Sequence, residues 1–98
     1  MSSLPNCARG EAVMQADGRP LKLCLTLGAL ARLEAAFSVE TLPDLEARLR
    51  NLSGQDILVV ISALLSGESL SPSDLAQCRI DPEEAVRAIA QAFERAGA

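Results

Sequence analysis

The sequence contains no histidine, tryptophan or tyrosine, and its only aromatic side chains are two phenylalanines. Without histidine, the chain lacks the side chain that most often acts as a general base near neutral pH. Cysteine is also scarce: Cys7, Cys24 and Cys78 form no CxxC pair, which disfavours both a zinc site and a disulfide framework. We therefore expect no metal or cofactor site, and reduced thiols, with Cys24 and Cys78 serving as small apolar residues.

Basic residues are few and scattered along the chain. The sequence has 9 Lys and Arg against 13 Asp and Glu, a formal net charge of −4, and its closest basic pair is Arg48 and Arg50. Binding to a phosphate backbone needs a concentrated positive face, so nucleic acid is excluded as an expected partner.

Long apolar runs are absent too. The most apolar run, residues 57–65, is too short to cross a bilayer, which takes about 20 residues. The N-terminal segment MSSLPNCARG has neither the basic nor the apolar region of a signal peptide. We expect a soluble, cytoplasmic protein with no membrane partner, in which residues 1–9 form a flexible tail and residues 10–98 form a single domain.

The strongest strand signal is the alternation of leucine with lysine, cysteine and threonine over residues 21–27. The preceding dipeptide Asp17-Gly18 accepts the positive φ values of a type I′ turn, which predicts a hairpin with a first strand over residues 11–16. A two-residue loop sets Met14 opposite Leu21 and Ala12 opposite Leu23, and so forms one apolar face. A shifted turn is the alternative, because the proline at the start of the second strand cannot donate to the ladder.

Helical patterns fill the remainder of the chain. Helices are expected over residues 27–37, 43–52, 57–66 and 71–78 and from Pro82 onward, with Thr41, Ser53, Ser71 and Asp81 as N-caps. In the first helix, Leu27 and Ala31 should extend the buried stripe. In the last, Glu84 should close a capping box, and the buried stripe should be Val86, Ile89, Ala90 and Phe93. The expected fold is α+β, an N-terminal β-hairpin packed on a small bundle of four to five short helices.

Gly28 falls in the first turn of the helix over residues 27–37, where a glycine is costly. Because it has no Cβ, it could let the helix lie close against the strand that the chain has just left, which makes it a packing residue. The alternative is a tolerated glycine in a frayed first turn.

The sequence shows no catalytic constellation. Most carboxylates stand at predicted helix starts, where they stabilise the positive end of the helix. The turns ADGR and LSGES resemble neither a P-loop nor a dinucleotide fingerprint. We expect no enzymatic activity and no catalytic, cofactor-binding or metal-binding residues.

The aliphatic helix near residues 57–65 carries more apolar side chains than one buried stripe needs. Its off-stripe members Leu58, Val59 and Leu65 are therefore candidates for contact with a protein partner. The alternative for Val59 is a position in the core under the acidic segment 68–74.

Several of these segments together resemble the small tail assembly proteins of gene transfer agents and related siphophages, over roughly residues 10–95. They are the glycine-turned hairpin, the leucine-alternating strand, GALARLEAAF, LLSGES and DLAQCRIDPEEAVRAIAQAF. The most specific part is Gly28-Ala29-Leu30 followed by Leu33-Glu34. Members of this family are labelled both as tail tube protein and as tail assembly chaperone.

The resemblance implies a cytoplasmic bacterial protein, encoded by a gene transfer agent or a prophage, that acts by binding and needs no cofactor. As a tail assembly chaperone it would keep tape-measure or tail tube subunits soluble until they polymerise. The tube label suits the pattern less, because a tube ring is normally built on an extensive β-sandwich and this chain has strand signal for one hairpin. The alternative function is a small regulatory or adaptor protein-interaction domain of a bacterial operon.

Overall fold

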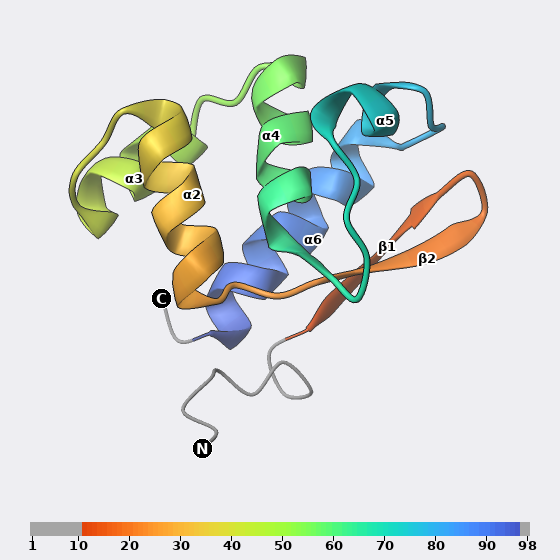
Figure 1. Ribbon diagram of the computed structural model, residues 1–98, viewed down its shortest axis with the longest axis horizontal. Coiled ribbons are helices and arrows are strands. Elements are labelled where there is room, and N and C mark those ends of the chain that lie inside the picture. Colours follow the sequence, from red (N-terminus) through yellow and green to blue (C-terminus); the bar gives the residue numbers. More distant parts are fainter. Residues whose placement is uncertain (1–10, 97–98) are drawn as a thin grey trace.

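The computed structural model describes residues 11–96, which form an α+β fold, as expected (Figure 1). The described elements are β1 (Ala12–Ala16), β2 (Arg19–Leu23), α2 (Leu27–Phe37), α3 (Leu42–Leu49), α4 (Gly54–Leu64), β3 (Leu65–Ser66), α5 (Pro72–Ala76) and α6 (Pro82–Arg95). The expected tail at residues 1–9 lies outside the described part of the chain, and the domain boundary at residue 10 stays a prediction.

The hairpin has the predicted turn and register. Asp17 and Gly18 have φ values of 54° and 77°, and the pairs Ala12–Leu23 and Met14–Leu21 face each other. The inward side chains of both strands are almost fully buried, as one apolar face requires. The turn is tied to the segment before α6, because the Asp17 N–H donates to the Arg79 carbonyl at 3.1 Å and the Arg79 N–H donates to Oδ1 of Asp17 at 2.8 Å.

A third strand was not predicted. Strand β2 ends at Leu23, and α4 ends at Leu64, where its carbonyl accepts from the Cys24 N–H at 2.8 Å. The next two residues then pair with β2, Leu65 opposite Leu23 and Ser66 opposite Lys22. The predictions of a strand to residue 27 and a helix to residue 66 are therefore wrong. The pairing of Leu65 and Ser66 with β2 ends α4 at Leu64, and the chain after Leu23 leads into the N-cap of α2 at Thr26.

Helix α2 begins at Leu27, as predicted, but its buried face differs from the predicted one. Oγ1 of Thr26 accepts from the Ala29 N–H at 3.0 Å, so Thr26 is an N-cap and the chain is helical from Leu27. Leu27 is 76% exposed and Ala31 is exposed, so neither extends the buried stripe. The buried residues of this helix are Ala29 and Leu33.

Gly28 is not a packing residue. It is exposed, and among the described residues a Cβ built there would meet only Oγ1 of Thr26, at 3.8 Å, which is an ordinary contact. The structure fits the alternative, a glycine that is tolerated in the first turn. The N-cap at Thr26 stabilises this turn, and no described strand lies close to Gly28.

The cysteines differ from each other. Cys78 is a free thiol, whereas Cys24 is buried and disulfide-bonded. The expectation of a reduced Cys24 is therefore wrong. The spacing of cysteines along the sequence reveals only local pairs such as CxxC. Disulfide formation between distant cysteines depends on which backbone segments the fold brings together.

The helix caps at Thr41, Ser53 and Ser71 are confirmed, and the last two are full capping boxes with Asp56 and Asp74. At the last helix, Asp81 caps by accepting from the Glu83 N–H at 3.0 Å. Glu84 closes no box there, because its carboxylate is directed to strand β1 instead.

Helices α4 and α6 pack against each other, and α6 also packs along β1. Val60, Ile61 and Leu64 of α4 are fully buried. The buried face of α6 consists of Ala85, Ala88, Ile89, Ala92 and Phe93. Burial of Ile89 and Phe93 is as predicted, but Val86 is 46% exposed and Ala90 is exposed, so that part of the predicted stripe is wrong. The helix instead turns three other alanines to the core, where small side chains permit close packing.

Candidate functional site

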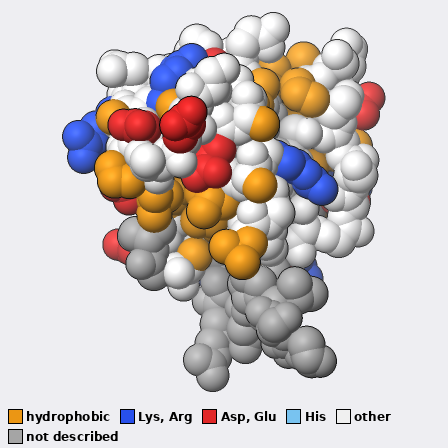
Figure 2. Space-filling model, turned by 60° about the vertical axis from the view of Figure 1, so that its left-hand side comes forward, with side chains coloured by type: hydrophobic (Ala, Val, Ile, Leu, Met, Phe, Trp, Pro, Cys, Tyr) orange, Lys and Arg blue, Asp and Glu red, His pale blue; other side chains and the backbone are white. Residues whose placement is uncertain are grey.

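Apolar side chains remain at the surface of this small fold. Figure 2 shows the side of the molecule that carries α2 and α3, where hydrophobic side chains gather beside several acidic groups. None of the described residues has a buried polar or charged side chain, so the polar side chains lie at the surface, around these apolar areas. A concave apolar surface is therefore a better candidate site in this fold than a polar cleft.

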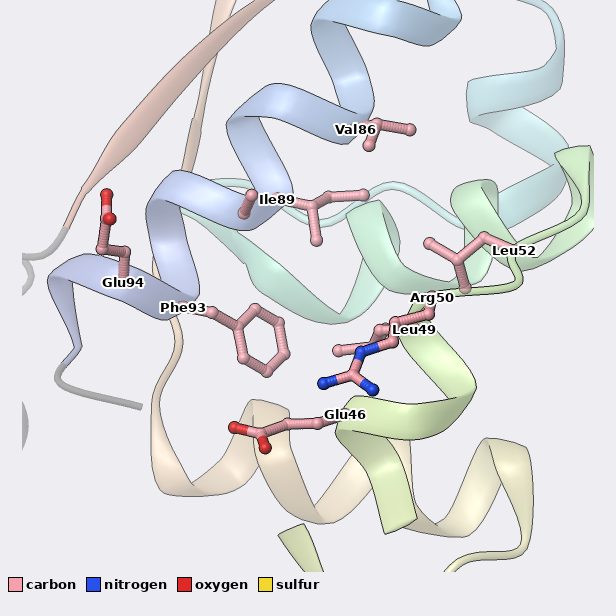
Figure 3. A pocket seen from close by; sticks show the side chains of 9 residues that line it. Glu46, Leu49, Arg50, Leu52, Val86, Ile89, Phe93 and Glu94 are labelled. Atoms are coloured by element: carbon pink, nitrogen blue, oxygen red, sulfur yellow. The ribbon is translucent and has the colours of Figure 1, made fainter. Parts of the chain in front are cut away.

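A groove of about 430 Å³ lies between α3 and α6, and we call it the α3–α6 groove (Figure 3). It is lined by Glu46, Leu49, Arg50 and Leu52 on one side and by Val86, Ile89, Ala90, Phe93 and Glu94 on the other. Six of these nine side chains are apolar, so the groove suits contact with an apolar surface.

The apolar floor follows from how the two helices are oriented. Helix α6 directs three of its alanines to the sheet and core, which leaves Val86 and Ala90 facing outward and places Ile89 and Phe93 at the boundary. From the opposite wall, the half-buried Leu49 and Leu52 complete the floor. The groove is therefore a second apolar face of α6, next to its buried face.

Charged side chains stand at the rim of the groove. Glu46 and Arg50 lie one helical turn apart on the α3 side, and Glu94 stands on the α6 side (Figure 3). Two carboxylates against one guanidinium leave the rim with a net charge of −1. A partner segment that carries a basic residue beside its apolar side chains would match this rim.

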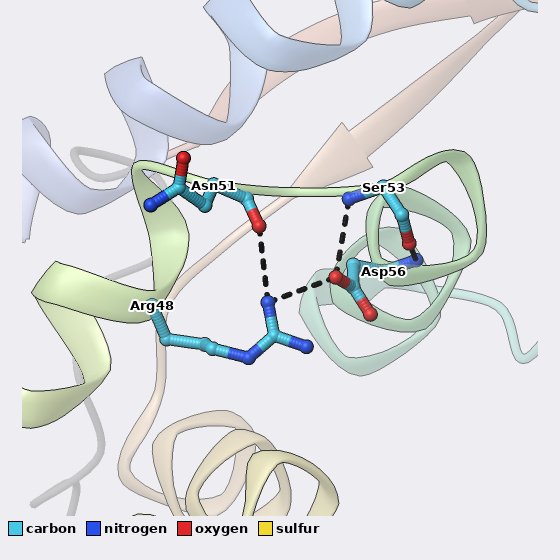
Figure 4. Close-up of polar contacts among 4 residues, drawn as sticks. All are labelled: Arg48, Asn51, Ser53 and Asp56. Carbon is cyan, nitrogen blue, oxygen red and sulfur yellow. Dashed lines mark hydrogen bonds and ion pairs between the residues drawn. The ribbon is translucent and has the colours of Figure 1, made fainter.

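The position of α3 depends on one arginine (Figure 4). Nη1 of Arg48 donates to Oδ2 of Asp56 at 2.9 Å and to the carbonyl of Asn51 at 3.0 Å, and its guanidinium lies 4.8 Å from the ring centroid of Phe37. The same Asp56 oxygen accepts from the Ser53 N–H at 3.1 Å. Arg48 thus joins α3 to the end of α2 and the start of α4.

The environment of Asp56 changes its acidity. Its pKa is lowered, first because the carboxylate accepts from the backbone N–H of Ser53 and second because it accepts from the side chain of Arg48. The charged form is therefore favoured at the junction of α3 and α4.

The three predicted partner-binding residues lie in separate places. Leu58 lines a hollow of about 270 Å³ between α4 and the α5 region, where Leu75 and Ile80 also lie. Val59 lines a different hollow, of about 350 Å³, with Arg32 of α2. Leu65 is paired in β3.

All three side chains are half-buried. Leu58 and Leu65 pack against the core, whereas Val59 does not belong to that cluster. Their role in partner binding stays a prediction, and they do not form one continuous surface.

The groove residues were missed because the sequence pattern of α6 has two apolar faces. Residues 85, 88 and 92 define one face with alanines, and residues 86, 90 and 93 define another. Of the predicted stripe, Ile89 and Phe93 are buried, whereas Val86 and Ala90 are exposed, and Ala85, Ala88 and Ala92 complete the buried face instead. The width of this apolar arc was the available signal, since it exceeds what one interface needs.

The chemistry of the described residues is limited. Within residues 11–96, no three Cys, Asp or Glu side chains come together as a metal-ligand set. In the same range, no helix is long and apolar enough to span a bilayer. The lining of the groove supplies apolar contact and three charged side chains.

The fold and this site define a small α+β domain that presents an apolar groove between two helices. Residues 9–96 match the model of the family described as "Phage tail tube protein, GTA-gp10". The chain belongs to this family and is a tail-related protein of phages and gene transfer agents. No curated protein and no solved structure matches it.

Proposed function

We propose that the protein is a tail assembly chaperone that acts by binding rather than by catalysis. In this role it holds a tail tube or tape-measure subunit in the bacterial cytoplasm until the subunit enters a growing tail. The observation that carries the proposal is the α3–α6 groove, which leaves Val86 46% exposed beside Ile89 and Phe93. The small sheet supports this role over that of a tube subunit, because its described strands contain 5, 5 and 2 residues.

The proposed occupant is an amphipathic helix of the tail subunit. A groove between two helices suits a third helix, whose apolar stripe can pack along Val86, Ile89 and Phe93. A lysine or arginine beside that stripe would lie near Glu46 and Glu94, where the rim carries its excess negative charge.

The test is co-expression with the tail tube and tape-measure proteins encoded by the neighbouring genes, followed by pull-down and affinity measurement. Val86→Asp places a charge in the groove, where complex formation would bury it, so affinity should fall by about 100-fold or more. Val13→Asp is a matched control, because Val13 is 49% exposed on the hairpin and Val86 is 46% exposed. The control should bind like the unchanged protein, and circular dichroism should show that both variants are folded.

A third variant, Val59→Asp, compares the groove with the surface predicted on α4. If only this variant loses binding, the partner lies on α4 and the groove assignment is wrong. If the unchanged protein binds neither tail protein, the chaperone role itself is wrong. Tail genes on both sides of this gene would further support the role, whereas their absence would favour the regulatory or adaptor alternative.

A further inference from the structure

Strand β1 forms one edge of the sheet, whose strand order is β1-β2-β3. The edge of a sheet presents backbone N–H and C=O groups that can pair with another chain, and proteins commonly block such edges with charged residues, proline or a bulge. The β1 sequence AVMQA contains no charge, no proline and no glycine. Its protection against pairing therefore has to come from elsewhere in the fold.

The register shows which backbone groups face away from β2. Gln15 lies opposite Pro20, which has no N–H to donate, and the N–H of Gln15 is directed to a different acceptor. Outward groups alternate along an antiparallel edge, so the backbone groups of Val13 and Glu11 face the same way as those of Gln15.

Helix α6 satisfies two of these outward groups. Oε2 of Glu84 accepts from the Gln15 N–H at 3.3 Å, and Nη1 of Arg95 donates to the Glu11 carbonyl. The two side chains are eleven positions apart, about three helical turns, so they project from the same side of α6. We call Glu84 and Arg95 the edge caps.

The buried alanines of α6 explain how one helix reaches both ends of the strand. Ala85, Ala88 and Ala92 are at most 2% exposed, and Ala12 and Ala16 of β1 are also buried. Such small side chains allow the helix to lie close along the strand, which brings the longer flanking side chains within reach of its backbone.

We propose that the edge caps keep β1 from pairing with β1 of a second copy of this chain. With both caps in place, Val13 is the one residue between them whose outward backbone groups have no partner within residues 11–96, and one residue is too short for a ladder. A second copy is the occupant because an antiparallel β1–β1 pair is self-complementary and brings no like charges together.

The test measures self-association by sedimentation velocity over a concentration series. Glu84→Ala with Arg95→Ala removes both caps and should strengthen self-association by about tenfold or more relative to the unchanged protein. Glu84→Gln with Arg95→Lys is the matched control, since the new side chains can still accept and donate at the same places. This control should associate like the unchanged protein.

A further substitution identifies the surface. Val13→Pro in the cap-free variant removes the central outward N–H without removing a bond to β2, so association should return to its original strength. The proposal is wrong if the folded cap-free variant associates no more strongly than the unchanged protein, or if its association survives Val13→Pro.

Hydrogen exchange on the unchanged protein provides a test that does not depend on any variant's folding. The Gln15 amide should exchange more slowly than the Val13 amide, because only Gln15 donates to a cap. Equal exchange of the two amides would overturn the proposal even if the cap-free variant does not fold.

Discussion

Arg48 offers a direct test of how α3 is held in place. Arg48→Met keeps the length and the apolar stem of the side chain but removes the charge and the donors. The variant loses the bonds to the Asn51 carbonyl and to Asp56, together with the cation–π contact to Phe37. We expect the fold to persist with lower stability, because the apolar core is untouched.

The magnitude follows from these contacts. A cation–π contact contributes about 0.5–1 kcal/mol at a surface site, and one net hydrogen bond about 0.5–1.5 kcal/mol. The ion pair with Asp56 adds little, since the side chain of Arg48 is 39% exposed. The free energy of unfolding should therefore fall by about 1–2 kcal/mol, which corresponds to a Tm decrease of roughly 5–15 °C for a domain of this size.

The assay is thermal unfolding followed by circular dichroism, with Arg50→Met as the control. Arg50 lies in the same part of the chain and lines the groove, but its side chain makes no hydrogen bond or ion pair with residues 11–96. The control should change the free energy of unfolding by less than about 0.5 kcal/mol. Equal Tm values for the two variants would refute the argument that Arg48 joins α3 to its neighbours.

Two further predictions concern the charge at Asp56 and the glycines. Because the pKa of Asp56 is lowered in the folded state, its stabilising effect is present above the ordinary value of 3.8 and is lost as the pH falls through the lower folded-state value. NMR titration should show this lowered pKa, and Arg48→Met should raise it only part of the way, because the Ser53 N–H is the larger cause. Gly28→Ala should stabilise the protein by about 0.5–1 kcal/mol, whereas Gly67→Ala should destabilise it by about 1 kcal/mol, since Gly67 has a φ of 89°. Denaturant unfolding measures both, and a shift in the same direction would contradict the assignment of Gly28 as a merely tolerated residue.

Local signals predicted the hairpin and most helix starts correctly. The turn at Asp17-Gly18 depends on two adjacent residues that accept positive φ, and the caps at Ser53 and Ser71 depend on hydrogen bonds within three residues. Such interactions are encoded in short stretches of sequence, so a single chain is enough to find them.

Features that depend on distant segments were missed. Strand β3 forms only because the end of α4 meets β2, and Leu65 carries no strand signal of its own. Which face of α6 is buried depends on the hairpin beside it: the helix packs on β1 with the face that carries Ala85, Ala88 and Ala92, and the face with Val86 is left exposed. The role of Glu84 was assigned to a local capping box, whereas its partner Gln15 lies 69 positions away.

The two walls of the α3–α6 groove differ in stiffness. Helix α6 is bonded to β1 through Glu84 and to the residue before β1, Glu11, through Arg95, and the segment before α6 is bonded to the hairpin turn through Arg79. Helix α3 packs mainly on α2 and relies on Arg48 for its polar contacts with the start of α4. Thermal motion that widens the groove should therefore displace α3 more than α6, and the partner helix proposed above would enter by moving α3.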